Sequence, residues 1–188
     1  MLKERISALQ ALLNDAQPVV RQAASAALEE LEAIADTEHL LDMLKSGSRG
    51  ERIAAAYALE RVNAAKVFPP LLDALKSDDA DLRSVVVRVL GRKKHPKTAA
   101  ALVKMLDDDI VPVQVEAARA LGGFADRRLP EHLAPLVKQE EQVALAAIES
   151  IGQLAFPEGE AALLAALRDQ RPEIRSRAAE MLGKLHLS

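Results

Sequence analysis

The stretch PEIRSRAAEMLGKL, residues 172–185, decides the fold because its pattern returns along the whole chain. Its Arg175 marks a register that recurs about every 31 residues, a spacing typical of tandem structural repeats. The register positions are Arg21, Arg52, Arg83, Gln114, Ala144 and Arg175. Three residues after each stands a smaller apolar residue: Ala24, Ala55, Val86, Ala117, Ala147 and Ala178. Seven residues after each stands a large one: Leu28, Leu59, Leu90, Leu121, Ile151 and Leu182. Positions three, four and seven apart share one helix face, so each copy predicts a helix with a buried stripe.

A second apolar cluster, such as Leu71, Leu72 and Leu75, precedes most copies and predicts another helix in each repeat. A pair of helices this short cannot bury its apolar face unless neighbouring pairs stack on it. We therefore expect an all-α, right-handed α-solenoid of about six two-helix repeats, forming a single array over residues 1–188. The expected repeats are 1–35, 36–64, 65–95, 96–126, 127–156 and 157–188, with turns at Asp36, Asn63, 94–96, Asp126 and 156–157.

The register VRxxAAxALGxI within a helix pair resembles the HEAT-like repeats of the phycobilisome-lyase type. PEIRSRAAEMLGKL and VQVEAARALGGF (residues 113–124) are the best copies, and the resemblance covers essentially the whole chain. It implies that the first helices lie on the convex side of the array and the second helices on the concave side. It also implies that each register Arg bridges an Asp or a backbone carbonyl. The fifth repeat departs, because it lacks the Arg and carries Pro135, which should kink or break its first helix.

Glycines also fall in register, at Gly91, Gly122, Gly152 and Gly183. Glycine inside a helix costs about 0.5–1 kcal/mol relative to alanine. Four of them at one register therefore indicate close approach of neighbouring helices. None follows a strand, as a nucleotide-binding loop would require.

Composition limits the classes of function. The net charge is −3 and the sequence has no Trp. It also has no Cys, so neither disulfides nor thiolate metal sites can form. The N-terminus has charged residues within its first five positions and no long apolar run, so we expect neither a signal peptide nor a membrane span, and a cytoplasmic protein. We expect no cofactor and no metal, because the four His residues make no chelating set with neighbouring carboxylates. No Ser lies in a nucleophile elbow, and we expect no enzymatic activity.

The most informative surface lies five and nine residues after the register position, where the side chains share a helix face. In the middle repeats it presents Tyr57, Arg61, Arg88, Arg92 and Arg119, with Glu149 and Gln153 on the next copy. Stacking should align these positions along a concave groove that is Arg-rich at its centre and acidic on either side. An ordinary solvated face of mixed charge is the alternative. Arginine favours bidentate contacts to carboxylates and is frequent at interface hot spots.

We therefore expect a non-catalytic scaffold or adaptor that binds a protein or peptide partner, an acidic one, in this groove. A nucleic-acid-binding repeat protein is an alternative, which the net negative charge and the scarcity of aromatic residues disfavour. A factor that attaches chromophores, like the bilin lyases, is another, through the resemblance of the repeat alone. We take the chain as a monomer by default and expect no membrane partner.

Overall fold

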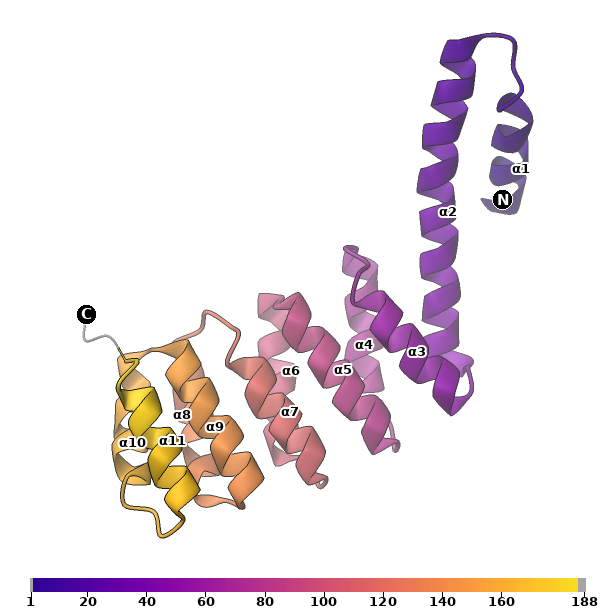
Figure 1. The fold of residues 1–188 in the computed structure, drawn as a ribbon. Coiled ribbons are helices and arrows are strands. Elements are labelled where there is room, and N and C mark those ends of the chain that lie inside the picture. The colour runs from indigo at the N-terminus through magenta and orange to yellow at the C-terminus, as the bar shows by residue number, and fades with distance from the viewer. Residues whose placement is uncertain (1, 186–188) are drawn as a thin grey trace. The chain divides into compact units, whose positions relative to one another are not determined.

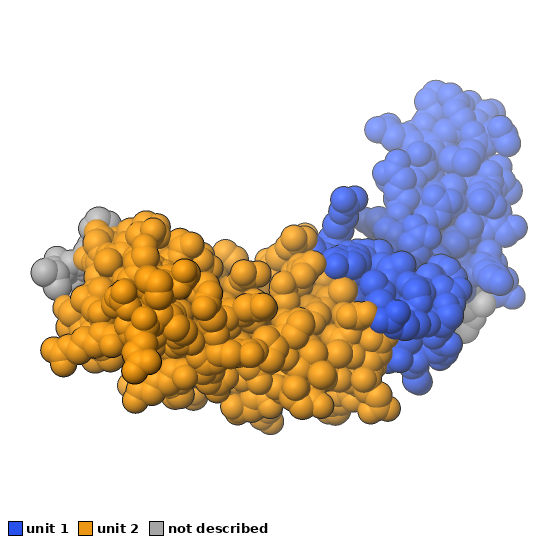
Figure 2. Space-filling model, turned by 60° about the horizontal axis from the view of Figure 1, so that its bottom comes forward, with its two compact units in different colours: residues 1–62 blue, residues 63–188 orange. Residues whose placement is uncertain are grey.

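The computed structural model describes residues 2–185, and within them all regular structure is helical (Figure 1). The chain forms two compact units, residues 1–62 and residues 63–188, which Figure 2 colours blue and orange. Unit 1 contains α1 (Leu2–Leu12), α2 (Pro18–Ser46) and α3 (Arg49–Leu59). That all six repeats form a single array stays a prediction.

The turn that we predicted at Asp36 is absent, which corrects the expected boundary between repeats 1–35 and 36–64. Helix α2 runs unbroken for 29 residues through this point. No Gly or Pro lies between residues 19 and 46 to interrupt it. Thr37 is tolerated inside the helix because it is buried and its hydroxyl donates to the carbonyl oxygen of Ala33 at 2.8 Å. The chain turns instead at residues 47–48, and a capping box of Ser48 and Glu51 begins α3.

Unit 2 contains helix pairs in two layers. The first helices are α4 (Phe68–Ala74), α6 (Ala99–Lys104), α8 (Leu129–Leu133) and α10 (Glu160–Ala166). The second helices are α5 (Ala80–Lys93), α7 (Val111–Leu121), α9 (Glu141–Leu154) and α11 (Pro172–Leu182). Short 3-10 turns complete the first helices: η1 (Ala65–Val67), η2 (Pro96–Thr98), η3 (Met105–Asp107), η4 (Ala134–Lys138) and η5 (Pro157–Gly159). Successive second helices pack side by side, each beside its own first helix, as in an α-solenoid (Figure 1).

The predicted register is the buried stripe of these helices. Each of the six smaller residues three positions after the register is at most 2% exposed. Of the large residues seven positions after it, all are buried except Leu182 on the last helix, which is half-buried. The repeat pattern in the sequence is therefore a pattern of burial.

Close helix approach explains the glycine register within unit 2. A Cβ added to Gly91 of α5 would lie 2.5 Å from the Cβ of Ala120 on α7. A Cβ at Gly152 of α9 would lie 2.5 Å from the sulfur of Met181 on α11. At Gly183, which caps the last second helix, the nearest atom among residues 2–185 would be the carbonyl oxygen of Glu180 at 3.6 Å. Glycine is needed where a following second helix packs against it.

The register Arg residues hold the turn that precedes their own helix, as the resemblance implied. Nη1 of Arg175 donates to the carbonyl oxygens of Asp169 and Gln170, each at 2.8 Å. Arg21 binds the carbonyl oxygens of Asp15 and Ala16 in the same way. These bonds satisfy backbone acceptors that the turn leaves without helical partners.

The middle repeats vary this contact. In the fourth repeat, the Nε2 amide of Gln114 donates to the carbonyl oxygen of Asp108 at 2.5 Å and so replaces the Arg. Arg83 also crosses to the next repeat, where its Nε and Nη2 donate to the two carboxylate oxygens of Asp108, each at 2.8 Å. The register side chain therefore joins turns as well as closing them.

Pro135 interrupts the first helix of the fifth repeat, as the sequence predicted. Helix α8 has only five residues and ends at Leu133, and the 3-10 turn η4 follows. Proline lacks the N–H that an α-helix would need at this point. The interruption shapes the outer surface of unit 2 beside α10.

Candidate functional site

The second helices of unit 2 present the candidate surface, since they carry five of the seven residues that the sequence singled out. We use the term second-helix face for a set of exposed and half-exposed side chains on α5, α7, α9 and α11. These side chains stand two, five and nine residues after each register position. Because these four helices lie side by side, a side chain on one can reach its neighbour on the next.

Arg88 is bound to a carboxylate of the adjacent helix. Its Nε and Nη2 donate to the two carboxylate oxygens of Glu116 on α7, at 3.0 and 2.8 Å. The Arg88 side chain is 38% exposed and that of Glu116 is 19% exposed. A guanidinium held in this bidentate geometry has fewer donors left for a partner, so Arg88 is as much a structural residue as a binding one.

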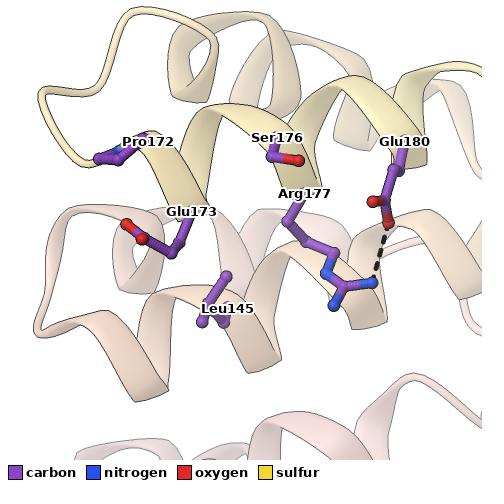
Figure 3. A pocket seen from close by; sticks show the side chains of 6 residues that line it. All are labelled: Leu145, Pro172, Glu173, Ser176, Arg177 and Glu180. Carbon is purple, nitrogen blue, oxygen red and sulfur yellow. Dashed lines mark hydrogen bonds and ion pairs between the residues drawn. The ribbon is translucent and has the colours of Figure 1, made fainter.

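The fifth and sixth repeats carry the same contact with its charges reversed. Glu149 of α9 pairs with Arg177 of α11 at 3.3 Å, and Arg177 also pairs with Glu180 on its own helix at 2.9 Å. Arg177 and Glu180 also line a hollow of about 440 Å³, together with Leu145, Pro172, Glu173 and Ser176 (Figure 3). Glu149, Glu180 and the adjacent Glu173 outnumber the cations Arg177 and Lys184 here, so this end of unit 2 is acidic.

Arg119 on α7 differs from both. It is exposed, and its side chain has no hydrogen-bond or ion-pair partner within residues 2–185. The position on α9 that corresponds to Glu116 on α7 and to Arg177 on α11 is Ala146, which cannot accept a hydrogen bond through its side chain. Arg119 therefore keeps all its guanidinium donors available.

Lys94 adds a second cation close to the C-terminal end of α7. A Cβ added to Gly123 would lie 3.0 Å from Cε of Lys94, so the lysine side chain extends over Gly123. Gly123 is four residues after Arg119 and lies just beyond the end of α7 at Leu121. Lys94 ends α5 in the left-handed conformation, with φ 48°, and this conformation turns the chain away from the helix. We call Arg92, Lys94 and Arg119 the basic patch.

The remaining predicted residues fall in different surroundings. Arg92 is exposed at the end of α5, and Gln153 is exposed on α9, where its Oε1 would lie 2.7 Å from a Cβ at Gly122. Tyr57 of α3 is 39% exposed and Arg61 follows the same helix, exposed. Both belong to unit 1, so their place in one groove with the unit 2 residues stays a prediction.

Sequence reasoning missed Glu116 and Arg177, the partners that bind Arg88 and Glu149. Both pairs join the fifth position of one second helix to the second position of the next. Each partner has the opposite charge and lies three residues short of one full repeat farther along the chain. The sequence therefore does contain a signal for both pairs. Its absence at Ala146 singles out Arg119.

The described part of the chain contains neither a metal-binding cluster nor a membrane-spanning helix. No group of three or more His, Asp or Glu side chains within residues 2–185 is placed to hold a metal ion. None of the helices there is both long enough and apolar enough to cross a membrane.

Several known folds resemble this arrangement. A chain of the CpcE–CpcF complex of phycocyanin lyase from Nostoc sp. PCC7120 matches with a TM-score of 0.70 and 20% identity, over 81% of this chain and 65% of that chain. The present chain thus spans just under two thirds of that relative. A designed armadillo repeat protein in complex with the peptide (KR)4 matches with a TM-score of 0.64 and 17% identity, over 98% and 99% of the two chains. At such identities the likeness shows the fold alone.

Sequence comparison identifies the repeat itself. No curated protein matches the chain. The model of the PBS lyase HEAT-like repeat matches residues 51–77, and the model of HEAT repeats matches residues 68–142 and 131–187. Because the latter covers more than half of the sequence and the helix pairs of unit 2 have the corresponding geometry, the chain belongs to the HEAT-repeat family.

Proposed function

We propose that the chain is a protein-binding scaffold whose second-helix face takes an acidic segment of a partner at the basic patch. The observation that supports this most directly is Arg119, an exposed guanidinium without a partner between two neighbours that are paired across helices. A carboxylate of the partner would complete at Arg119 the contact that Glu116 makes to Arg88.

The charge distribution on the second-helix face sets the direction of such a segment. The basic patch lies on the third and fourth repeats, whereas on the fifth and sixth Glu149 and Glu180, with Glu173 beside them, outnumber Arg177 and Lys184. A partner with carboxylates over α5 and α7 and with neutral or basic residues over α9 and α11 fits both ends. Electrostatic complementarity of this kind gives specificity and speeds association.

Selection of short random peptides displayed on phage tests the proposal. The wild-type chain should enrich peptides with Asp or Glu clusters, and added salt should weaken their binding, because the contacts are exposed. The variant Arg119→Glu with Lys94→Glu should lose these peptides. The matched control is Lys104→Glu with Lys97→Glu, two exposed lysines on and beside the first helix α6, which should retain them.

The proposal fails if the enriched peptides carry no excess of acidic residues, or if the basic-patch variant binds them as the wild type does. Enrichment of basic peptides would instead move the site to the acidic end of the face, at Glu149, Glu173 and Glu180.

A role in chromophore attachment is a second candidate, favoured by the PBS lyase repeat at residues 51–77 and by the likeness to the phycocyanin lyase structure. Mixing the chain with a free bilin tests it. Binding would shift and sharpen the visible absorption band of the bilin, whereas an unchanged spectrum at high protein concentration would dismiss this candidate.

A further inference from the structure

An apolar trough lies between the first helices of the fifth and sixth repeats, in the other layer of unit 2. It has a volume of about 850 Å³ and is lined chiefly by Ala134, Pro135, Val137, Ala161, Ala162 and Ala165. Charged side chains border it only at its two ends. The second-helix face contributes none of its lining residues.

The sequence explains why the trough is open. The 3-10 turn η4, which contains Pro135, takes the place of a second helical half over five residues, against three in η3 after α6. The opposite wall, α10, presents alanines where longer side chains would fill the space. The corresponding trough between α4 and α6 is lined by Leu72, Leu75 and Met105 and has about 460 Å³.

The two walls are fixed to each other at both ends. At the start, Nε of Arg127 donates to Oε1 of Glu158 at 2.8 Å. At the far end, Arg171 donates to the carbonyl oxygens of Gln139, at 2.6 Å, and Val137, at 3.3 Å, while it also binds Asp169. The trough is therefore preformed, and an occupant does not have to order its walls.

The ends of the trough carry opposite charges. Glu131 and Glu158 lie at the start of the walls, and Lys138 and Arg168 lie at the far end. The side chains of Glu131, Lys138 and Arg168 have no partner within residues 2–185. Oε2 of Glu158 is buried without a hydrogen bond, and the pKa of this carboxyl is lowered by its own backbone N–H and by Arg127, so the start retains negative charge.

The chemistry of the walls selects an occupant with its own backbone hydrogen bonds satisfied. Both walls are helical, so they offer no row of free N–H and C=O groups to an extended peptide. A helix satisfies its backbone internally and can press large side chains into a floor of alanines. The seven residues of α10 measure about 10 Å, enough to contact two turns of such a helix.

We infer that the apolar trough binds an amphipathic α-helix of a protein partner, through bulky apolar side chains and through charged residues at the two ends of that helix. The partner helix runs antiparallel to α10. In this direction its acidic first turn meets Lys138 and Arg168, and its basic last turn meets Glu131 and Glu158. Acid at the N-terminus and base at the C-terminus also stabilise the helix itself.

A synthetic helical peptide tests the inference by fluorescence anisotropy with the full chain. The probe has Glu in its first turn, Leu residues at i, i+3, i+4 and i+7, and Lys in its last turn. We expect saturable binding that a peptide of the same composition in scrambled order does not show. Substitution Ala165→Leu fills the trough and should weaken binding at least about tenfold, and Lys138→Glu with Arg168→Glu should do the same.

Matched variants separate the trough from general effects. Ala179→Leu changes an exposed alanine on α11 of the same repeat, and Lys97→Glu with Lys104→Glu reverses two charges beside the smaller trough. Both should bind the probe as the wild type does, and circular dichroism should show all variants folded. Equal binding by Ala165→Leu and the wild type, or no binding by the wild type, overturns the inference.

A second copy of the chain is the competing occupant. Sedimentation of the chain alone distinguishes it: self-association that Ala165→Leu abolishes would show the trough to be a homotypic interface and would also overturn the inference. The binding of acidic peptides at Arg119 is independent of all these outcomes.

Discussion

The guanidinium of Arg83 and the carboxylate of Asp108 form a bidentate ion pair that joins the third repeat to the fourth. Their side chains are 10% and 4% exposed, so both charges are largely removed from water. The same guanidinium donates to the carbonyl oxygen of Ser77 at 2.8 Å and to Asp109 at 3.0 Å. One side chain thus fixes the turn before α5 and the turn before α7.

Replacing Arg83 by Gln should destabilise unit 2 by about 3 kcal/mol, because it leaves the buried carboxylate of Asp108 without its counter-charge. Urea denaturation followed by circular dichroism measures the loss. Arg175→Gln is the matched control. Arg175 is exposed, and within residues 2–185 its side chain donates hydrogen bonds to carbonyl oxygens alone, so its loss should cost about 1 kcal/mol or less. Equal losses in the two variants would contradict the role assigned to the ion pair.

Gly91→Ala should destabilise the array by about 1–3 kcal/mol, because the new Cβ would lie 2.5 Å from the Cβ and 3.0 Å from the Cα of Ala120. Gly183→Ala should instead stabilise it by about 0.5–1 kcal/mol, since its nearest contact would be 3.6 Å and alanine favours the helix. Thermal unfolding of both variants measures whether each substitution lowers or raises the stability of the fold. A destabilised Gly183→Ala would show that this position also faces a packed neighbour.

Arg88 and Glu116 should couple by about 0.5–1 kcal/mol in a double-mutant cycle with alanine, as expected for a partly exposed ion pair. The exchanged pair Arg88→Glu with Glu116→Arg should recover most of the stability that either single reversal loses. The cycle is measured by urea denaturation at low and at high salt, and the coupling should shrink at high salt. Additive single losses at low salt would show that the pair makes no net contribution.

Acid should destabilise the fold in part through Asp126. Hydrogen bonds from the guanidinium and the backbone N–H of Arg128 lower the pKa of this carboxyl from 3.8 to about 2. Because the folded state holds the proton less tightly than the unfolded state, the contribution is complete above about pH 4 and is lost as the pH falls toward 2. Thermal melts of Asp126→Asn across this range should therefore decline less steeply than those of the wild type. Parallel declines would place the acid sensitivity elsewhere, for example at Asp169, whose pKa Arg171 lowers also.

The sequence predicts the buried part of this fold well, because burial repeats with the same period as the residues. Ala117 and Leu121 are fully buried, and their spacing alone indicated that they would be. The periodic pattern of apolar residues could not show whether the chain turns at Asp36. A single Asp is compatible with a turn or with a helix interior, and only the structure shows that the helix continues, with the hydroxyl of Thr37 bonded to the carbonyl oxygen of Ala33 inside it.

The candidate site was less predictable than the core. Sequence periodicity correctly placed Arg88 and Arg119 at equivalent positions, but their surroundings depend on one residue of the following helix. Glu116 engages Arg88, and Ala146 leaves Arg119 open. Periodicity therefore finds the face of a helix, whereas the availability of each side chain is decided by its neighbour across the packing contact.

The glycines at the helix contacts have a consequence for how such a surface can evolve. Since Gly91, Gly122 and Gly152 bring second helices together against atoms of the next helix, the interval between helices is set by the contact itself and not by the exposed side chains. Substitutions on the outside can then rewrite the order of charges while the pitch on which they stand remains constant. New recognition surfaces can therefore arise by substitution in one repeat at a time, while the distance between neighbouring helices stays the same.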